Sequence, residues 1–357
     1  MKLTLIGDDF ARDVLSSPDT AALASQRYSE WYHFTFGDVR AGIGGVVNFA
    51  LFGDVRDPER GRASMSLVVH EGARRWSGTV DMYGTDEARF TPGTVGLAMG
   101  SNTVRFDEGR YAVAAELKNR TVSIDATWTP RADAVRVENI GGFVNSFIVP
   151  RLDVTGVVRI GDRAIALERA GGYHDHNWGA WDWDRDVGWN WGYLLEAGAP
   201  RERENAVVFG QVTDATRGAA RSGLVVMRWR GAKLTQVFLD DAVTLEALGR
   251  LAVEPPRVPG VLALFVPGRV APVPEHLRVV AADGADTLRI DCRVRDAIHF
   301  LIPHAAGNGQ TTVAELAGDY AASGELDGES VAFTCPAFAE LAGTSRSGHP
   351  ASSDVDV

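Results

Sequence analysis

Alternating hydrophobic and polar residues run through most of the sequence. Residues 121–128 (TVSIDATW) and 288–295 (LRIDCRVR) are clear cases. A period of two is the pattern of a β-strand that buries one face. Gly, Asn and Asp separate the alternating runs, as hairpin turns require. Helical patterns are short and weak, with the best at residues 20–28 and 338–341. The sequence therefore predicts an all-β, mostly antiparallel barrel or sandwich with few short helices.

Similar segments recur in the two halves of the chain. Residues 45–69 resemble residues 206–226, with Asp, Gly and Leu positions at one constant separation. A second pair of segments, late in each half, sets Asp175 opposite Glu340. Because the matches keep the same order along both halves, they indicate an internal duplication.

The chain length also suits two domains, since 357 residues exceed the usual size of one. We expect an N-terminal segment at residues 1–24, a first domain at residues 25–180 and a second at residues 181–342. The remaining residues, 343–357, are rich in Ser, Gly and Asp, and we expect them to be disordered.

Charge and composition exclude some classes of partner. The formal net charge is −11, which argues against nucleic acid and anionic membrane surfaces as partners. The best apolar stretch, residues 261–266, is far shorter than a membrane-spanning helix needs. The N-terminus lacks an apolar stretch of secretory length, and Cys292 and Cys335 are too few for a disulfide framework. We therefore expect a cytoplasmic protein without an integral membrane segment, and the oligomeric state stays open.

The densest chemistry lies at residues 171–193, GGYHDHNWGAWDWDRDVGWNWGY, which hold five of the nine tryptophans. If this segment is extended, alternate side chains point to opposite faces. One face would carry Tyr173, Asp175 and Asn177. The opposite face would carry His174, His176 and Trp178. The next strand would present Trp189, Trp191 and Tyr193 on one face.

Asp175 is the candidate acid of this segment. In a cavity walled by aromatic rings, desolvation would raise the pKa of its carboxyl group, and the neutral form could donate a proton or a hydrogen bond. Aromatic faces could stabilise a developing carbocation. These parts suit acid-initiated chemistry on an alkene, or hydrogen-bond activation of a polar group on an apolar substrate. Two structural alternatives stay open: the tryptophans plug a barrel end, or Asp175 accepts backbone hydrogen bonds at a turn.

A metal site is the other possible use of the segment. His174 and His176, two residues apart, could be ligands on one strand face. No third ligand is evident nearby, and His299, His304 or Glu196 would have to come from elsewhere. We therefore expect structural hydrogen bonds and no metal. The chain also lacks a Walker loop, a GxGxxG motif opening a helix and a GxSxG elbow, so no cofactor is expected.

The segment GGYHDHNWG, residues 171–179, resembles the signature of a double lipocalin-like family. That family includes carotenoid 1,2-hydratase (hydroxyneurosporene synthase), AttH-like proteins and fungal decalin-forming Diels–Alderases. The specific similarity runs from Gly171 to about Glu196, and a weaker one follows the two-half layout. The resemblance implies two calycin-type β domains around apolar cavities, with polyenes, isoprenoids or polyketides of secondary metabolism as substrates.

The resemblance also implies roles for single residues. The family's Tyr-x-Asp pair falls on Tyr173 and Asp175. Asp175 would protonate a terminal alkene, Tyr173 and nearby tryptophans would stabilise the cation, and water would add. In a pericyclase, the pocket would instead fold a linear polyene into a reactive shape. The run after the motif, AWDWDRDVGWNWGY, is closer to the general AttH-like pattern than to the carotenoid hydratases.

The leading hypothesis is thus a cofactor-independent enzyme that hydrates or cyclises a hydrophobic, unsaturated small molecule. The alternative is a non-catalytic carrier of a hydrophobic ligand. The residues expected to contact the substrate are His174, His176, Asn177, Trp178, Trp189, Trp191, Tyr193, Glu196, Trp31 and Glu340.

Overall fold

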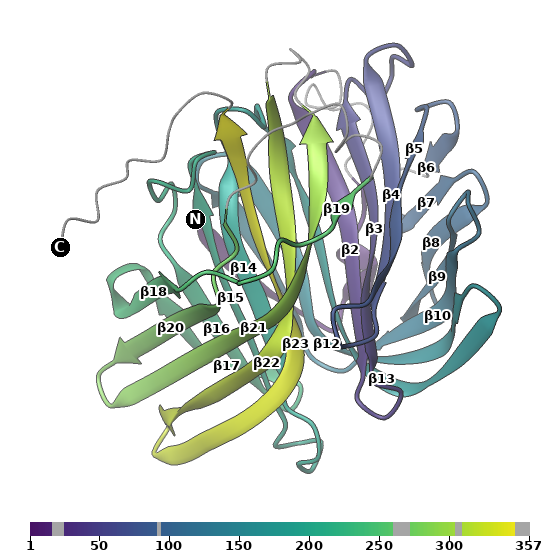
Figure 1. Cartoon of the computed structure of the whole chain (residues 1–357). Coiled ribbons are helices and arrows are strands. Elements are labelled where there is room, and N and C mark those ends of the chain that lie inside the picture. The colour runs from purple at the N-terminus through teal and green to yellow at the C-terminus, as the bar shows by residue number, and fades with distance from the viewer. Residues whose placement is uncertain (16–24, 91–93, 260–271, 304–308, 347–357) are drawn as a thin grey trace.

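A computed structural model describes residues 1–15, 25–90, 94–259, 272–303 and 309–346. The described chain is nearly all β, in two curled sheets that form a barrel and a half-barrel (Figure 1). Its helices are two 3₁₀ turns, η1 (Phe10–Arg12) and η3 (Asp240–Ala242). The predicted all-β, lipocalin-like fold is therefore confirmed.

The first sheet contains thirteen strands in the described chain. Its strands are β1 (Lys2–Gly7), β2 (Tyr28–Asp38), β3 (Ile43–Gly53), β4 (Gly61–His70), β5 (Trp76–Tyr83), β6 (Ala88–Phe90), β7 (Gly96–Met99), β8 (Asn102–Asp107), β9 (Arg110–Glu116), β10 (Val122–Pro130), β11 (Ala134–Ile140), β12 (Val144–Ile160) and β13 (Arg163–Ala180). The order is β5-β4-β3-β2-β13-β12-β10-β9-β8-β7-β6, and β1 joins through β11. The sheet thus includes part of the predicted N-terminal segment.

The second sheet repeats this arrangement with fewer strands. Its strands are β14 (Gly188–Leu195), β15 (Asn205–Thr213), β16 (Val225–Arg230), β17 (Lys233–Leu239), β18 (Val243–Leu248), β19 (Arg257–Val258), β20 (His276–Asp283), β21 (Asp286–Pro303), β22 (Gly309–Leu326) and β23 (Glu329–Arg346). The order is β17-β16-β15-β14-β23-β22-β21-β20-β18, and β19 pairs in parallel with β21. In both sheets the first long strand pairs with the last, β2 with β13 and β14 with β23.

The strand register agrees with the repeat read from the sequence. Asp175 of β13 lies opposite His33 of β2, and Glu340 of β23 lies opposite Trp191 of β14. Asp175 and Glu340 therefore occupy matching places in the two sheets.

One of the two expected helices differs in the structure. Residues 338–341, predicted to be helical, lie inside β23, where they pair with β22 and β14. Pairing on both sides satisfies the backbone groups that a short helix would leave open. The helix expected at residues 20–28 falls mostly outside the described residues, and Tyr28 opens β2. Strand β23 runs to Arg346, past the expected end of the second domain at residue 342, and the rest of the expected tail is not described.

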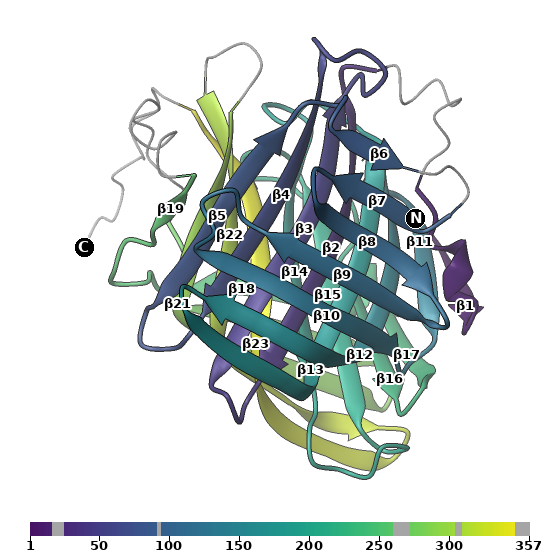
Figure 2. The ribbon, with the colours of Figure 1, turned by 90° about the vertical axis from the view of Figure 1, so that its right-hand side faces the viewer.

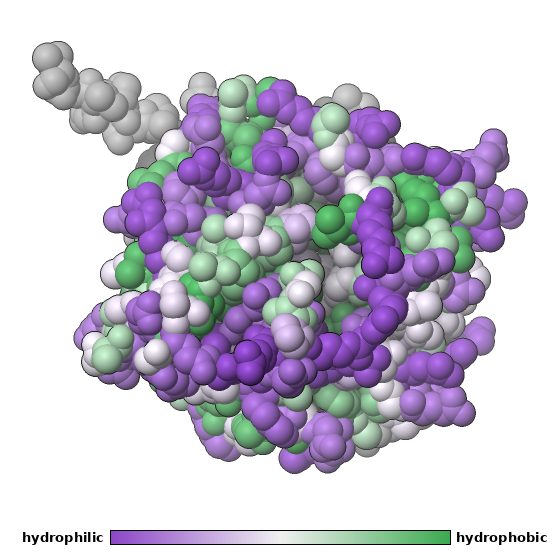
Figure 3. All heavy atoms as spheres, turned by 90° about the horizontal axis from the view of Figure 1, so that it is seen from below, coloured by the Kyte–Doolittle hydropathy of each residue, from purple (hydrophilic) through white to green (hydrophobic). Residues whose placement is uncertain are grey.

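The apolar residues divide between two interiors and one interface. One core fills the first barrel and another lies inside the second sheet. Two more clusters form where the outer faces of the sheets pack together, as in Figure 2, where β2–β5 lie in front of the second sheet. Seen from below, the molecule presents mostly hydrophilic side chains, with small apolar patches (Figure 3). In the described chain, no helix is long and apolar enough to cross a membrane.

Candidate active site

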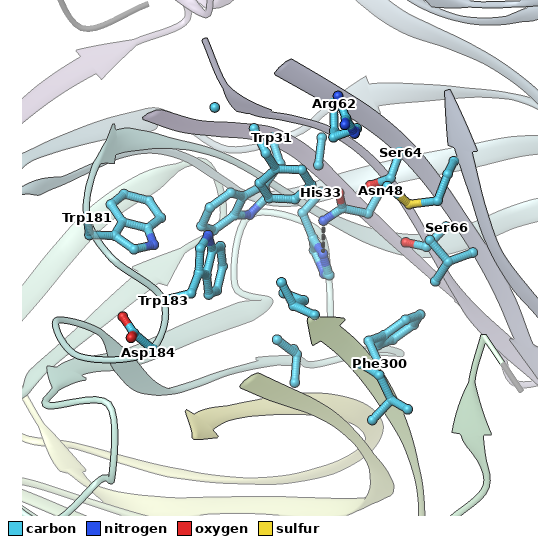
Figure 4. A pocket seen from close by; sticks show the side chains of 18 of the residues that line it. Trp31, His33, Asn48, Arg62, Ser64, Ser66, Trp181, Trp183, Asp184 and Phe300 are labelled. Atoms are coloured by element: carbon cyan, nitrogen blue, oxygen red, sulfur yellow. Dashed lines mark hydrogen bonds between the residues drawn. The ribbon is translucent and has the colours of Figure 1, made fainter. Parts of the chain in front are cut away.

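A cavity of about 820 Å³ lies between the outer faces of the two sheets. The first sheet contributes β2–β5, the second contributes β14 and β21–β23, and residues 181–185 lie between them in the chain. One wall is aromatic and another carries polar side chains (Figure 4). The cavity volume falls in the usual range for small-molecule sites.

The aromatic wall is built from four tryptophans. Trp31 stacks on Trp189 with ring centroids 5.8 Å apart, and it meets the edge of Trp181 at 5.7 Å. Trp183 lies 6.1 Å from Trp31 and donates a hydrogen bond to the Ser29 hydroxyl at 3.1 Å. The ring faces thus form a rigid apolar surface beside the cavity.

A polar wall adjoins the aromatic wall on β2, β3 and β4. His33, Asn48, Ser64 and Ser66 line the cavity there. The Asn48 amide lies 3.5 Å from Nδ1 of His33. Burial, followed by the positive charge of His174, lowers the pKa of His33 to about 3, so its ring is neutral at pH 7.

Three carboxyl groups lie together beside this cavity, Asp175 and Glu315 buried and Glu340 half-buried, and we call them the carboxyl cluster. Glu315 and Glu340 line the cavity and lie opposite each other on β22 and β23. Their side chains share a hydrogen bond, which requires a proton on one of them. Burial raises the pKa of both, and the charge of Glu340 raises that of Glu315 further. The pair is therefore suited to hold a proton at neutral pH.

Asp175 is buried beside this pair without bordering the cavity. It accepts a hydrogen bond from the Tyr173 hydroxyl at 2.7 Å and another from the Asn177 amide. Burial raises the pKa of Asp175 to about 8; the Tyr173 hydrogen bond opposes this, and the charge of Glu340 adds to it. Glu315 and Glu340 are thus the members of the cluster that line the cavity, and Asp175 lies behind them, within reach of the charges of both.

Tyr173 is held by two aromatic neighbours on β14. Trp191 donates a hydrogen bond to its hydroxyl at 2.8 Å, and Tyr193 stacks on its ring at 4.6 Å. These contacts confirm that Tyr173 and Asp175 share a face, and that Trp191 and Tyr193 point toward them. They form a hydrogen-bonded chain from Trp191 through Tyr173 to Asp175, behind the cavity wall.

The two histidines of the motif lie in the interior of the first barrel, away from the cavity. Nε2 of His174 and Nδ1 of His176 each lie 2.8 Å from the Asp13 carboxylate, and Nε2 of His176 lies 2.7 Å from Glu30. Although burial lowers it, hydrogen bonds to Asp13 and Glu30 raise the pKa of His176 to about 9. Neither histidine lines the cavity, whereas the sequence predicted substrate contact for both. Both instead hydrogen-bond to buried carboxylates inside the barrel.

The other expected contact residues divide into two groups. Trp31, Trp189 and Glu340 line the cavity, and Trp189 donates a hydrogen bond to Glu340. Trp178 packs on His176, with the Arg136 guanidinium 4.8 Å from its ring centre, and Glu196 accepts hydrogen bonds from Asn205. Neither Trp178 nor Glu196 lines the cavity.

Several cavity residues were not anticipated from the sequence. His33, Glu315, Trp181 and Trp183 all line the cavity. Glu315 had a usable signal, because it is a lone carboxylate in the apolar run VAELA, residues 313–317. An acid in a strand of that kind must be either paired or functional.

Among the described residues, one group has the donor set of a metal site. Ligand atoms of His33, Glu315 and Glu340 all lie within 4.8 Å of one another. A cation there would have to displace the proton that Glu315 and Glu340 share. The same side chains therefore serve two exclusive states, a protonated pair or a metal site. His304, named earlier as a distant ligand candidate, lies outside the described residues.

The fold and the cavity together define a double lipocalin-like β protein with its candidate site between the halves. No family model matches the sequence, and no curated protein matches it. The chain resembles the crystal structure of an AttH candidate from Nitrosomonas europaea, with a TM-score of 0.66, 14% identity, and 97% of this chain and 98% of that chain covered. It also resembles kievitone hydratase from Nectria haematococca, with a TM-score of 0.57, 13% identity and 95% of each chain covered.

A third similar structure is CghA with Sch210972, with a TM-score of 0.53, 12% identity, and 97% of this chain and 99% of that chain covered. These structures are of the double lipocalin-like type to which residues 171–179 pointed, so that resemblance is confirmed in the fold. At such low identity the likeness shows the fold alone, and function has to be argued from the site.

Proposed function

We propose that this protein is a cofactor-independent enzyme that hydrates or cyclises a hydrophobic, unsaturated small molecule in the cavity between the sheets. The observation that carries the proposal is that Glu315 and Glu340 face each other at a cavity walled by tryptophans, where burial raises the pKa of both. Isoprenoids, polyenes and polyketides have the size and apolar character that such a cavity suits. The similar structures support this class, since one is named as a hydratase and another holds an organic small molecule.

In the hydration reaction, the proton held by the Glu315–Glu340 pair is donated, and Glu340 delivers it to the substrate. The π electrons of an alkene take its proton, forming a new C–H bond and leaving a cation on the adjacent carbon. The ring faces of Trp31 and Trp189 stabilise that cation. Water then adds to the cation and returns one proton to the Glu340 carboxylate. The balance is alkene plus water giving an alcohol, with the enzyme unchanged.

In this proposal, Asp175 and Tyr173 do not contact the substrate, and they influence how tightly Glu340 holds its proton. A neutral Asp175 adds no repulsion to Glu340, whereas an ionised Asp175 would hold the Glu340 proton more tightly. Burial keeps Asp175 mostly neutral at pH 7, against the hydrogen bonds from Tyr173 and Asn177, which favour its ionised form. This proposal therefore changes the roles that the family resemblance implies. Glu340, which lines the cavity, contacts the substrate, and Asp175 acts on it from behind.

Cyclisation would use the same parts without proton transfer. A neutral carboxyl group can donate a hydrogen bond to a carbonyl and so activate a dienophile. The polar wall of Asn48, Ser64 and Ser66 offers further donors beside the aromatic wall. The cavity would hold a linear polyene in a folded, reactive shape.

The test is to incubate the protein with small-molecule extracts of its source and follow masses by liquid chromatography. A gain of one water indicates hydration, and an isomer of equal mass indicates cyclisation. A compound that copurifies unchanged, with no product at any enzyme concentration, would support the carrier alternative and overturn the enzyme.

Matched variants assign the acid once a substrate is found. Glu340→Gln should lower turnover by about 10²–10⁴, the usual range for general acid catalysis. Glu325→Gln, on the same strand as Glu315 but exposed, is the control and should leave turnover unchanged. Wild-type turnover by a folded Glu340→Gln protein would remove Glu340 as the donor. If Asp175→Asn lowered turnover to that extent while Glu340→Gln stayed active, Asp175 would be the proton donor instead.

A further inference from the structure

Buried polar groups without partners gather on the inner face of the second sheet. His299, Gln310 and Thr312 are 2%, 1% and 3% exposed. In the described structure, five of their side-chain atoms have no hydrogen-bond partner: both ring nitrogens of His299, the amide nitrogen and oxygen of Gln310, and the hydroxyl of Thr312. Folded proteins pair nearly all such atoms, so a group of five in one place needs an explanation.

The strand register puts the three side chains on one face. Thr312 of β22 lies opposite Leu301 of β21 and Gly343 of β23. Gln310 is two residues before Thr312 and therefore points the same way. His299 lies opposite Ala314, which faces the apolar core inside the second sheet. The inner face thus changes from apolar to polar beyond Ala314.

An arginine without a counter-ion lies next to them. The stem of Arg217 packs on Gly343, where an added β-carbon would lie 3.1 Å from the Arg217 Cγ. Arg217 forms no ion pair or side-chain hydrogen bond with a described residue, and burial lowers its pKa. Burial, then the positive charge of Arg257, lowers the pKa of His299 to about 4; the negative charge of Glu254 opposes this shift, and the positive charge of Arg217 adds to it. Because Gly343 lies opposite Thr312 on the neighbouring strand, the Arg217 side chain lies on the same face as the unpaired groups and next to Thr312.

We propose that Arg217, His299, Gln310 and Thr312 form a binding site for a small oxyanion, a carboxylate or a phosphate. Arg217 supplies the compensating charge, and its guanidinium fork matches the oxygens of such anions. The Gln310 amide, the Thr312 hydroxyl and an N–H of His299 supply further donors. Arg217 is half-buried, so a bound anion could bridge from its guanidinium to the buried polar groups.

This site is separate from the cavity between the sheets. The cavity is lined by Val313 and Glu315, which point to the opposite face of β22 from Gln310 and Thr312. An anion bound on the inner face would therefore act apart from the carboxyl cluster. A carboxylate effector or a phosphorylated metabolite is the chemistry that fits.

Isothermal titration calorimetry with sodium phosphate and, separately, sodium acetate tests the site. The wild-type protein should bind one equivalent of at least one anion, and which one binds identifies the source. Arg217→Met should weaken that binding at least tenfold. Arg159→Met removes an exposed arginine of the first sheet and should bind as the wild type does. Failure of both anions to bind the wild type, or equal loss in the two variants, would overturn the proposal.

A second variant guards against misfolding in the first. Thr312→Val keeps the shape of the side chain and removes a buried hydroxyl that has no partner. Without anion it should raise the melting temperature, and it should weaken anion binding severalfold. A melting temperature that rises while binding stays at the wild-type level would show that Thr312 faces no ligand and would overturn its part in the site.

Discussion

The Asp175→Asn substitution measures how strongly burial perturbs the carboxyl cluster. Burial raises the pKa of Asp175 to about 8 in the folded protein, against an ordinary value of 3.8. Between these two values the folded state binds one proton more than the unfolded state at this residue. Stability from Asp175 is therefore complete below about pH 4 and is lost as the pH rises toward 8.

The size of the effect follows from proton linkage. One proton bound preferentially by the folded state changes the free energy of unfolding by about 1.4 kcal/mol per pH unit. From pH 5 to pH 7, Asp175 should therefore cost the wild-type protein roughly 3 kcal/mol. Asparagine does not titrate, so Asp175→Asn should lose this part of the slope. Glu315 and Glu340, whose pKa values are also raised, should leave a residual slope in the variant.

Urea denaturation followed by tryptophan fluorescence at pH 5, 6 and 7 provides the measurement. The wild-type and Asp175→Asn curves of unfolding free energy against pH should diverge by about 1.4 kcal/mol per unit. Asp162→Asn, at an exposed position after β12, should run parallel to the wild type. Parallel curves for wild type and Asp175→Asn would show that Asp175 is ionised in the folded protein, and the reasoning on the cluster would fail.

Other contacts carry expectations of their own. Asp13→Ala should lower the free energy of unfolding by about 3–5 kcal/mol in urea titrations, because two buried histidines lose their acceptor; a loss under about 1 kcal/mol would show that the network adds little. Gly210→Ala should lower the melting temperature, because its β-carbon would lie 2.1 Å from the Trp191 ring, whereas Gly171→Ala, 3.5 Å from its nearest neighbour, should not; equal melting temperatures would contradict the packing. Elemental analysis of protein purified without added metal should show no stoichiometric zinc or iron; a bound equivalent lost in Glu315→Gln would contradict the proton-sharing pair.

Much of the fold follows from local pattern. The alternation at residues 121–128 became β10, and that at 288–295 lies within β21. Period two is a property of neighbouring residues, so it survives in any tertiary setting. Residues 338–341 show where local pattern fails: their short apolar run suits a helix or a strand, and pairing with β22 and β14 decides for the strand.

The candidate site was predicted only in part, for a physical reason. Alternation along β13 correctly separated Tyr173 and Asp175 from His174 and His176. It carried no information on which face would meet a cavity and which would fill a barrel. For this reason the sequence predicted substrate contacts at His174 and His176, which face the barrel interior instead.

The sequence by itself thus determined which side chains share a strand face, because that depends on the backbone of adjacent residues. Only the tertiary structure decided what each face meets, because the curl of each sheet and the packing of the two halves depend on residues far apart in the chain. Glu315 and Glu340 come from two strands, and they face each other only because β22 and β23 align them. Their shared proton and the tryptophan wall beside it are properties of that alignment and of the burial it produces.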